Sequence, residues 1–192
     1  MIYGLLKFLI RVILAVFRRW DVQGRENLPA SGGVVLVANH VSYWDPVVVI
    51  CAFSRKVHFM AKSELFNIPV VRYALRISGS FPVRRDISDR SAIRTAAKLL
   101  EEGQVVGIFP EGTRSHSGEL LKPNLGAAML AARAGVPMIP VAVIGTRSAF
   151  GRVKVRVGMP MDICKPGKCS KADLEEASDL IMVKIAELID RQ

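Results

Sequence analysis

Short apolar runs alternate with helix-like segments along most of this chain. Strict apolar runs of four to eight residues are typical of buried strands. A further segment alternates Val153, Val155 and Val157 with charged residues, which predicts a half-exposed strand near a sheet edge. Strands that alternate with helices predict an α/β fold, here with a mixed central β-sheet flanked by helices because some connections are short. The predicted strands are Val34 to Ala38, Val57 to Met60, Phe81 to Val83, Val105 to Phe109 and Met138 to Ile144.

Capping residues predict where several helices begin and end. Asp86 or Ser88 is expected to cap a helix whose apolar face runs from Ala92 to Leu100. Asn124 is expected to cap the next helix, which Gly135 ends. Near the C-terminus, Ser170 and Asp173 approximate a capping box for a last amphipathic helix to Leu188.

The first twenty residues predict a very apolar helix with a narrow basic stripe. Lys7, Arg11 and Arg18 fall on one side of it at a helical period. The preferred interpretation is an interfacial helix whose stripe faces anionic lipid phosphates. A helix packed on its own domain and a tilted spanning segment remain alternatives, whereas a secretory signal is disfavoured because charges interrupt the apolar part. We therefore expect a membrane-associating helix over 1–20 and a catalytic domain over 21–192.

The balance of charge points to a polyanionic partner. The chain has 27 Lys and Arg against 17 Asp and Glu, a net charge of +10. No nucleic-acid-binding motif accompanies this excess, so an anionic phospholipid membrane surface is expected and nucleic acid is not. The three cysteines, Cys51, Cys164 and Cys169, lack a C-x-x-C spacing, which predicts reduced thiols and no metal site.

The first candidate for chemistry is the segment that follows Val34 to Ala38. His40 stands where this strand should end, and Asp45 follows five residues later at the start of the next helix. On one straight helix the two side chains would point roughly 140° apart, because each residue turns about 100°. Only a strand-to-helix corner brings Asp45 back to His40, where it could hold one imidazole nitrogen and leave the other as a base. The alternative is a polar corner or helix cap without chemistry.

A second polar segment follows another apolar strand. Phe109-Pro110-Glu111-Gly112-Thr113-Arg114-Ser115 comes directly after the run that begins at Val105. Two polar corners after two buried strands indicate one site at one edge of the sheet.

The pair H-x-x-x-x-D and F-P-E-G-T-R-S closely resembles the glycerolipid acyltransferases, and among them the 1-acylglycerol-3-phosphate acyltransferases. Two weaker blocks agree in order and spacing, Gly79 to Arg85 and Val136 to Val143, and the resemblance covers roughly Val22 to Val157. Pro82 departs from the pattern, since the second block often carries an aromatic residue there.

The resemblance implies roles for particular residues. His40 and Asp45 would be catalytic, with His40 as the base. Arg114, Arg85 and Lys62 would bind an acceptor phosphate, for which arginine forks are well suited. The loop residues Glu111, Gly112 and Thr113 would also bind substrate; Glu111 would receive a glycerol hydroxyl or order the loop, and its alternative is a structural bond to backbone amides.

The implied reaction moves a fatty acyl group from acyl-CoA or acyl-carrier protein to the sn-2 hydroxyl of lysophosphatidic acid, giving phosphatidic acid. No cofactor or metal is expected, and the expected location is the cytoplasmic face of the cell membrane. No G-x-S-x-G elbow is present, so direct attack by the hydroxyl is expected. Another lysolipid or glycolipid acceptor, and a non-catalytic membrane-binding protein, remain alternatives.

Overall fold

The computed structural model describes residues 2–84, 89–148, 151–163 and 169–190. Six α-helices and seven strands, with two short 3₁₀ helices, make up the described part of the chain. In chain order these are α1 (Ile2–Arg18), β1 (Asp21–Gln23), η1 (Arg25–Asn27), β2 (Val34–Ala38), α2 (Asp45–Ala52), β3 (Val57–Lys62), η2 (Ser63–Asn67), α3 (Pro69–Ser78), β4 (Phe81–Val83), α4 (Arg90–Glu101), β5 (Val105–Ile108), α5 (Gly126–Ala134), β6 (Met138–Ile144), β7 (Lys154–Val157) and α6 (Lys171–Asp190).

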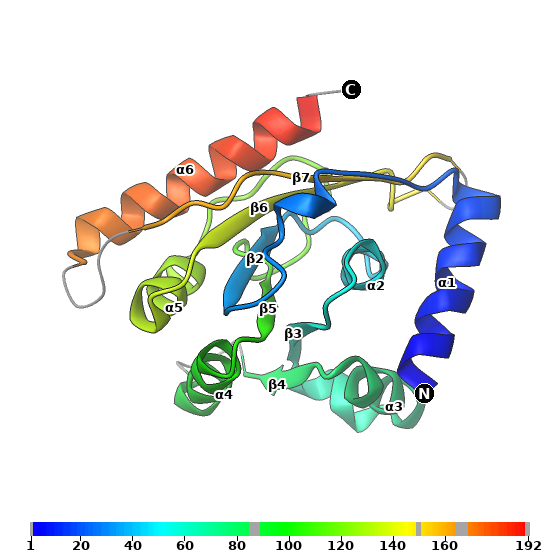
Figure 1. Ribbon diagram of the computed structural model, residues 1–192, viewed down its shortest axis with the longest axis horizontal. Coiled ribbons are helices and arrows are strands. Elements are labelled where there is room, and N and C mark those ends of the chain that lie inside the picture. Colours follow the sequence, from blue (N-terminus) through cyan, green and yellow to red (C-terminus); the bar gives the residue numbers. More distant parts are fainter. Residues whose placement is uncertain (1, 85–88, 149–150, 164–168, 191–192) are drawn as a thin grey trace.

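The described strands form one sheet in the order β1-β7-β6-β2-β5-β3-β4. All neighbouring strands are parallel except β6 and β7, which pair antiparallel. The short connection between β6 and β7 allows this antiparallel pair, whereas parallel neighbours need longer crossovers. The prediction of a mixed central sheet with flanking helices is confirmed (Figure 1).

Helices cover both faces of the sheet (Figure 1). Along β2, Val34, Leu36 and Ala38 pack in one buried cluster with α1 and α2, while Val35 and Val37 pack in a second cluster with α4, α5 and α6. This alternation follows from the period of two along a strand, and it explains why a strand buried on both faces is apolar throughout.

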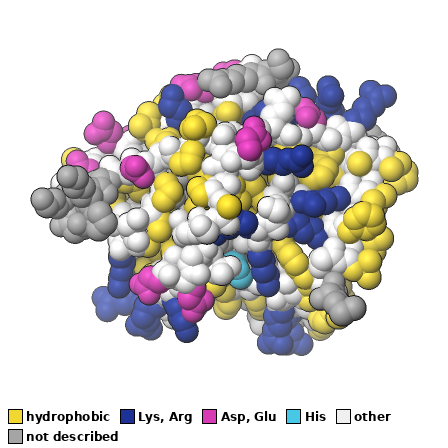
Figure 2. All heavy atoms as spheres, viewed as in Figure 1, with side chains coloured by type: hydrophobic (Ala, Val, Ile, Leu, Met, Phe, Trp, Pro, Cys, Tyr) yellow, Lys and Arg dark blue, Asp and Glu magenta, His cyan; other side chains and the backbone are white. Residues whose placement is uncertain are grey.

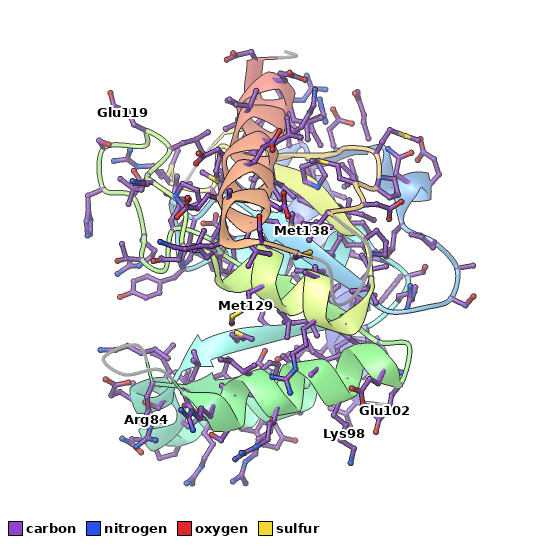
Figure 3. The ribbon with its side chains drawn as sticks, turned by 90° about the vertical axis from the view of Figure 1, so that its left-hand side faces the viewer. Arg84, Lys98, Glu102, Glu119, Met129 and Met138 are labelled. Atoms are coloured by element: carbon purple, nitrogen blue, oxygen red, sulfur yellow. The ribbon has the colours of Figure 1, made fainter. Side chains whose placement is uncertain are left out.

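The loops that follow β2, β4 and β5 leave the same edge of the sheet, because these strands run parallel. In Figure 3, Arg84 lies at one end of α4 and Glu119 lies in the loop after β5 on the same side, while Lys98 and Glu102 lie towards the other end of α4. We refer to this side as the catalytic edge, because it carries the two polar corners whose residues are predicted to be catalytic.

The basic side of helix α1 faces the protein, whereas the sequence predicted that it would face outward. Lys7 is buried, and Arg11 donates hydrogen bonds to the carbonyls of Cys51 and Phe53 at the end of α2. Arg18 donates to three carbonyls of the β6–β7 connection. The stripe therefore binds the protein's own carbonyls, and the prediction that it faces lipid phosphates is wrong.

The outward side of α1 is instead apolar. Figure 2 shows hydrophobic side chains along the edge of the molecule that α1 forms. No helix in the described ranges is long and apolar enough to cross a membrane. The exposed apolar residues of α1 are Ile2, Leu5, Leu6, Phe8, Leu9, Val12, Ile13, Val16 and Phe17.

Two other local predictions also change. Arg156 is buried rather than half-exposed, because β1 pairs with β7 and Asp21 accepts a 2.7 Å hydrogen bond from its guanidinium. Asp89 caps α4 by accepting bonds from the N–H groups of Ser91 and Ala92, so the expectation of a cap at residue 86 or 88 is wrong. The capping box of Ser170 and Asp173 is confirmed.

The cysteines do not all behave as expected. Cys51 is a buried free thiol on α2, whereas Cys169 is disulfide-bonded, so the prediction of three reduced thiols is wrong. Cys164 lies outside the described residues.

Candidate active site

Asn39 fixes the end of β2 at the catalytic edge. Its side-chain amide donates to the carbonyl of Val143 at 3.0 Å, and its side-chain oxygen accepts from the N–H of Val143 at 2.7 Å. Both groups are buried, and a buried amide with paired partners holds a fixed orientation. The next residue, His40, therefore starts from a rigid strand end.

The corner brings His40 and Asp45 together as predicted. His40 Nδ1 lies 2.9 Å from Asp45 Oδ2, and the same oxygen accepts the backbone N–H groups of Val41 and Ser42 at 2.6 and 2.7 Å. Pro46 at the start of α2 suits the first turn, where its missing N–H costs nothing. The tight turn from strand to helix thus wraps the backbone around the Asp45 carboxylate.

The contacts of Asp45 assign the tautomer of His40. Asp45 is fully buried, and an ionised carboxylate only accepts hydrogen bonds. In the neutral imidazole, Nδ1 then carries the proton that it donates to Asp45, which leaves the lone pair on Nε2. This is the arrangement a general base needs.

Thr146 is a member of this site that the sequence analysis missed. Its hydroxyl donates to Asp45 Oδ1, the carboxylate oxygen that His40 does not use, and its side chain is buried. Gly145 precedes it at φ +82°, and a side chain there would collide with the carbonyl of Arg152. The only signal in the sequence is the position of Thr146 just after the strand β6, at the catalytic edge.

Aromatic rings form one wall of the site. The His40 ring stacks on Phe109 with 4.0 Å between centroids, and Phe109 stacks on Phe59 at 5.0 Å. Phe59 lies on β3 and Phe109 directly follows β5, so two neighbouring strands supply the wall. Stacking against this wall limits the orientations of the imidazole ring.

Glu111 connects the second corner to the first. Its Oε1 accepts the backbone N–H of His40 at 2.8 Å, and its Oε2 accepts the N–H of Leu121 at 3.0 Å. Burial raises the pKa of Glu111, and these two hydrogen bonds partly oppose that rise. The N–H of Ser115 also donates to the carbonyl of His40 at 2.8 Å. Glu111 therefore orders the loop around His40, and its contact with a glycerol hydroxyl stays a prediction.

Gly112 and Asn124 give this loop its shape. Gly112 has φ +71°, and a Cβ there would lie 2.8 Å from the side-chain nitrogen of Asn124. Asn124 donates to the carbonyl of Pro110 from both its side chain and its backbone. Asn124 thus closes the loop, and the prediction that it caps α5 is wrong because no side-chain bond caps that helix. Thr113 is exposed at the loop's tip, and a contact with substrate stays a prediction for it and for Gly112.

Arg114 projects from this loop onto an aromatic side chain. Its guanidinium lies 3.5 Å from the centroid of the Tyr43 ring, and Nη2 donates to the Tyr43 hydroxyl at 2.8 Å. Among the described residues Arg114 has no ion pair. Stacking fixes the plane of the guanidinium and leaves donors for an anion.

The other predicted phosphate ligands are less settled. Lys62 ends β3 and pairs with Glu64 at 2.9 Å, and both side chains are half or more exposed, so an anion would have to displace Glu64. Arg85 lies outside the described residues. Within those residues, no three His, Cys, Asp or Glu side chains come together as metal ligands.

Comparison with known proteins relates this geometry to a family. A family model described as Acyltransferase matches residues 19–144. The 1-acyl-sn-glycerol-3-phosphate acyltransferase of Bacillus subtilis is 35% identical over 158 residues, which cover 79% of this chain and 78% of the relative. The chloroplastic 1-acyl-sn-glycerol-3-phosphate acyltransferase LPAT1 of Arabidopsis thaliana is 32% identical over 91% of this chain, which spans 50% of the plant protein.

A solved structure has the same fold. The 1-acyl-sn-glycerophosphate (LPA) acyltransferase PlsC from Thermotoga maritima superposes with a TM-score of 0.72 at 32% identity, over 90% of this chain and 73% of that one. The family match spans both polar corners and the strands that carry them, from before β1 to the end of β6. The chain therefore belongs to the acyltransferase family.

Proposed function

We propose that this chain is a 1-acyl-sn-glycerol-3-phosphate O-acyltransferase that makes phosphatidic acid for phospholipid biosynthesis. The observation that carries the proposal is the His40–Asp45 pair at 2.9 Å, with the Glu111 and Arg114 loop beside it. The names of its relatives and of the similar solved structure support the choice of acceptor. The donor is an acyl thioester, either acyl-CoA or acyl-carrier protein.

The proposed reaction is a direct acyl transfer. Nε2 of His40 removes the proton from the sn-2 hydroxyl as its oxygen attacks the thioester carbonyl. The C–S bond then breaks, and the leaving thiolate takes the proton from the imidazolium. Asp45 stabilises that imidazolium through Nδ1, so no covalent acyl-enzyme is needed.

The acceptor's phosphate is proposed to bind at Arg114, with Lys62 and Arg85 in support. A phosphate carries between one and two negative charges near neutral pH, and a planar guanidinium can bind two of its oxygens at once. Tyr43 holds Arg114 in one plane, which reduces the entropy lost when the phosphate binds.

We also propose that α1 holds the protein on the cytoplasmic face of the cell membrane. A single helix that exposes this many large apolar side chains is suited to lie in the interface between headgroups and acyl chains. Arg18, near the end of α1, donates to the carbonyl of Gly145, the neighbour of Thr146. One end of α1 therefore lies close to the catalytic edge, where a lipid acceptor could enter from the bilayer.

The test is acyl transfer from a labelled thioester to lysophosphatidic acid in vesicles, with His40→Ala alongside. We expect phosphatidic acid from the wild type and a loss of about 10²–10⁴-fold in kcat for the variant, the usual contribution of a general base. The melting temperature of the variant should stay near that of the wild type. Turnover retained by His40→Ala would remove it as the base, and product only from other lysolipids would replace the acceptor.

A further inference from the structure

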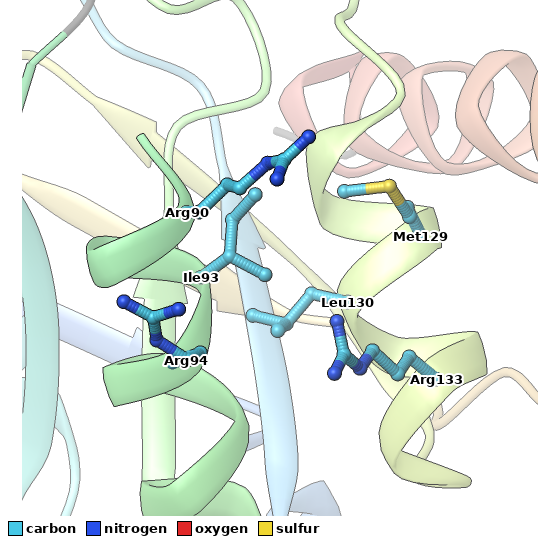
Figure 4. Close-up of a pocket in the computed structure, with 6 residues that line it drawn as sticks. All are labelled: Arg90, Ile93, Arg94, Met129, Leu130 and Arg133. Atoms are coloured by element: carbon cyan, nitrogen blue, oxygen red, sulfur yellow. The ribbon is translucent and has the colours of Figure 1, made fainter. Parts of the chain in front are cut away.

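A pocket of about 330 Å³ lies between α4 and α5, on the face of the sheet away from α1. Arg90, Ile93 and Arg94 line it from α4, and Met129, Leu130 and Arg133 line it from α5. In Figure 4, Arg90 reaches from α4 towards Met129, and Arg133 reaches from α5 towards Leu130. We call this the α4–α5 pocket.

The pocket combines an apolar floor with three cations. Leu130 is buried and Met129 is 38% exposed, whereas all three arginines are exposed. None of these arginines has an ion pair within the described parts of the chain. The lining contains no Asp or Glu, and three neighbouring guanidinium groups create a positive potential that attracts an anionic partner.

The arginines are arranged to fit an elongated acidic surface. Arg90 and Arg94 are four residues apart and so lie on one side of α4, about 6 Å apart along its axis, while Arg133 faces them from the next helix. Apolar Ile93 from α4 and Leu130 from α5 point towards each other between the arginines of the two helices (Figure 4). A helix with carboxylates on both flanks and apolar side chains along its centre could lie in this groove.

The position of the pocket suits a soluble partner of a membrane-bound enzyme. The exposed apolar side of α1 lies on the other face of the sheet, so α4 and α5 would face the aqueous side when α1 is in the bilayer. Met129 lies five residues after Asn124, whose side chain donates a hydrogen bond to the carbonyl of Pro110. Glu111, the residue after Pro110, accepts a hydrogen bond from the backbone N–H of His40. Arg90 is the first residue of α4, and Arg84 lies at the catalytic-edge end of this helix (Figure 3).

We propose that the α4–α5 pocket docks an acidic acyl-carrier protein, which delivers the acyl thioester over the catalytic edge to His40. This inference rests on the proposed acyltransferase function and assigns its donor. Direct contact with an anionic bilayer is disfavoured because α1 would hold this face away from the lipid. The nucleotide of acyl-CoA is disfavoured because its phosphates could contact only part of a basic surface that spans two helices.

The experiment compares the full-length wild type with Arg90→Gln/Arg94→Gln/Arg133→Gln and with Lys98→Gln as a matched control. Lys98 lies on α4 beyond the pocket and is likewise exposed. Initial rates are measured on vesicles containing lysophosphatidic acid, with acyl-carrier protein or CoA as the carrier of the same acyl chain. Binding of unacylated carrier protein to each immobilised variant is measured in parallel.

We expect the triple variant to raise the KM for acyl-carrier protein by about tenfold or more, and to weaken carrier binding equally, because it removes charges that steer association. Its kinetics with acyl-CoA should stay within about twofold of the wild type, and Lys98→Gln should match the wild type with both donors. Added salt should weaken carrier binding to the wild type far more than to the triple variant.

Several outcomes would overturn the docking proposal. An equal loss with both donors would assign the pocket to acyl-CoA, and weaker binding of the triple variant to vesicles would assign it to the bilayer. A wild type that uses acyl-CoA alone would also exclude a carrier site. If the wild type used neither donor, the proposed function would fail, and the binding measurement would still decide whether the pocket docks the carrier protein.

Discussion

The helices on the two faces of this sheet place their cations in opposite ways. On α1 the basic side chains turn inward, where Arg11 and Arg18 bind backbone carbonyls, and the apolar side chains face outward. On α4 and α5 the apolar side chains form the core, while Arg90, Arg94 and Arg133 are exposed. The outward apolar side of α1 is suited to a bilayer, and the charged surface of α4 and α5 is suited to water. We therefore propose that the sheet separates a lipid-facing side from an aqueous side.

The inward cations on α1 also have a physical reason. Helix α2 ends at Ala52, and the last carbonyls of a helix have no partner within it. Arg11 donates to two of the carbonyls at this end, those of Cys51 and Phe53, and its positive charge suits the negative end of the helix dipole. The basic stripe of α1 thus supplies hydrogen-bond donors to the free carbonyls at the C-terminal end of α2.

The largest expected effect comes from making the outer side of α1 resemble that of α4. Phe8→Glu/Phe17→Glu replaces two phenylalanines that are 62% and 72% exposed. Burying a large apolar side chain contributes about 1.5–3 kcal/mol, so the double variant should bind vesicles about 10²–10⁴-fold more weakly. Vesicle flotation measures this, and Arg72→Gln on α3 serves as a charge-changing control elsewhere on the surface.

The double variant should keep its fold, because both phenylalanines are exposed. Unchanged flotation together with an unchanged melting temperature would show that another surface binds the membrane. The comparison between the two faces would then lose its functional meaning.

The sequence predicts the two corners better than it predicts α1. The corner of His40 and Asp45 is local: five residues, a preceding apolar strand and a following proline suffice to require the turn. A helical period, by contrast, defines a stripe but does not say whether the stripe faces solvent, lipid or the protein. The partners of Arg11 and Arg18 lie 40 to 133 positions away, and no local pattern indicates them.

The same limit explains the residue that was missed. Thr146 reaches Asp45 across 101 positions because β6 is the neighbour of β2 in the sheet. The strand order follows from the packing of the whole domain, and the sequence analysis predicted strands without predicting their order. Glu111 was found from its motif, but its bonds to two backbone amides appear only in the folded loop.

The next largest effect concerns the hydrogen bond from Thr146 to Asp45, at the catalytic edge. Thr146 follows Gly145, whose carbonyl accepts a hydrogen bond from Arg18 of α1. Thr146→Val should lower kcat by roughly 10–100-fold, because a buried carboxylate oxygen that loses its donor costs about 1–3 kcal/mol and His40 loses a fixed partner. Thr146→Ser keeps the hydroxyl and should recover most of the activity. Steady-state kinetics on mixed vesicles measure both variants.

The KM for lysophosphatidic acid shows whether Thr146 positions Asp45 or binds the substrate. It should stay near the wild-type value in Thr146→Val, because Thr146 contacts Asp45 rather than the substrate. An increase in KM without a fall in kcat would assign Thr146 to substrate binding, and failure of Thr146→Ser to recover activity would exclude its hydroxyl.

The smallest effect concerns Lys7, the buried cation of α1. Burial, with the nearby charge of Arg11, lowers the pKa of Lys7 to about 8, while the ordinary pKa is 10.5. Between these two values the unfolded chain binds more protons than the folded protein, so this group's contribution to the free energy of unfolding rises with pH. The destabilisation that the buried charge of Lys7 causes is fully present below about pH 8 and disappears above pH 10.5.

Lys7→Met isolates this contribution from Tyr3 and Cys51, whose pKa values are raised in the same region. The Lys7 ammonium makes one long hydrogen bond, 3.5 Å to the carbonyl of Ser54, and lies 5.4 Å from the centroid of the Tyr3 ring, so methionine should fit with little loss. We expect the variant to melt about 2–4 °C higher than the wild type at pH 7 and at nearly the same temperature at pH 10.5. A constant difference across this range would show that folding leaves the pKa of Lys7 unchanged, and the higher melting temperature would then come from the added apolar side chain rather than from the removed charge.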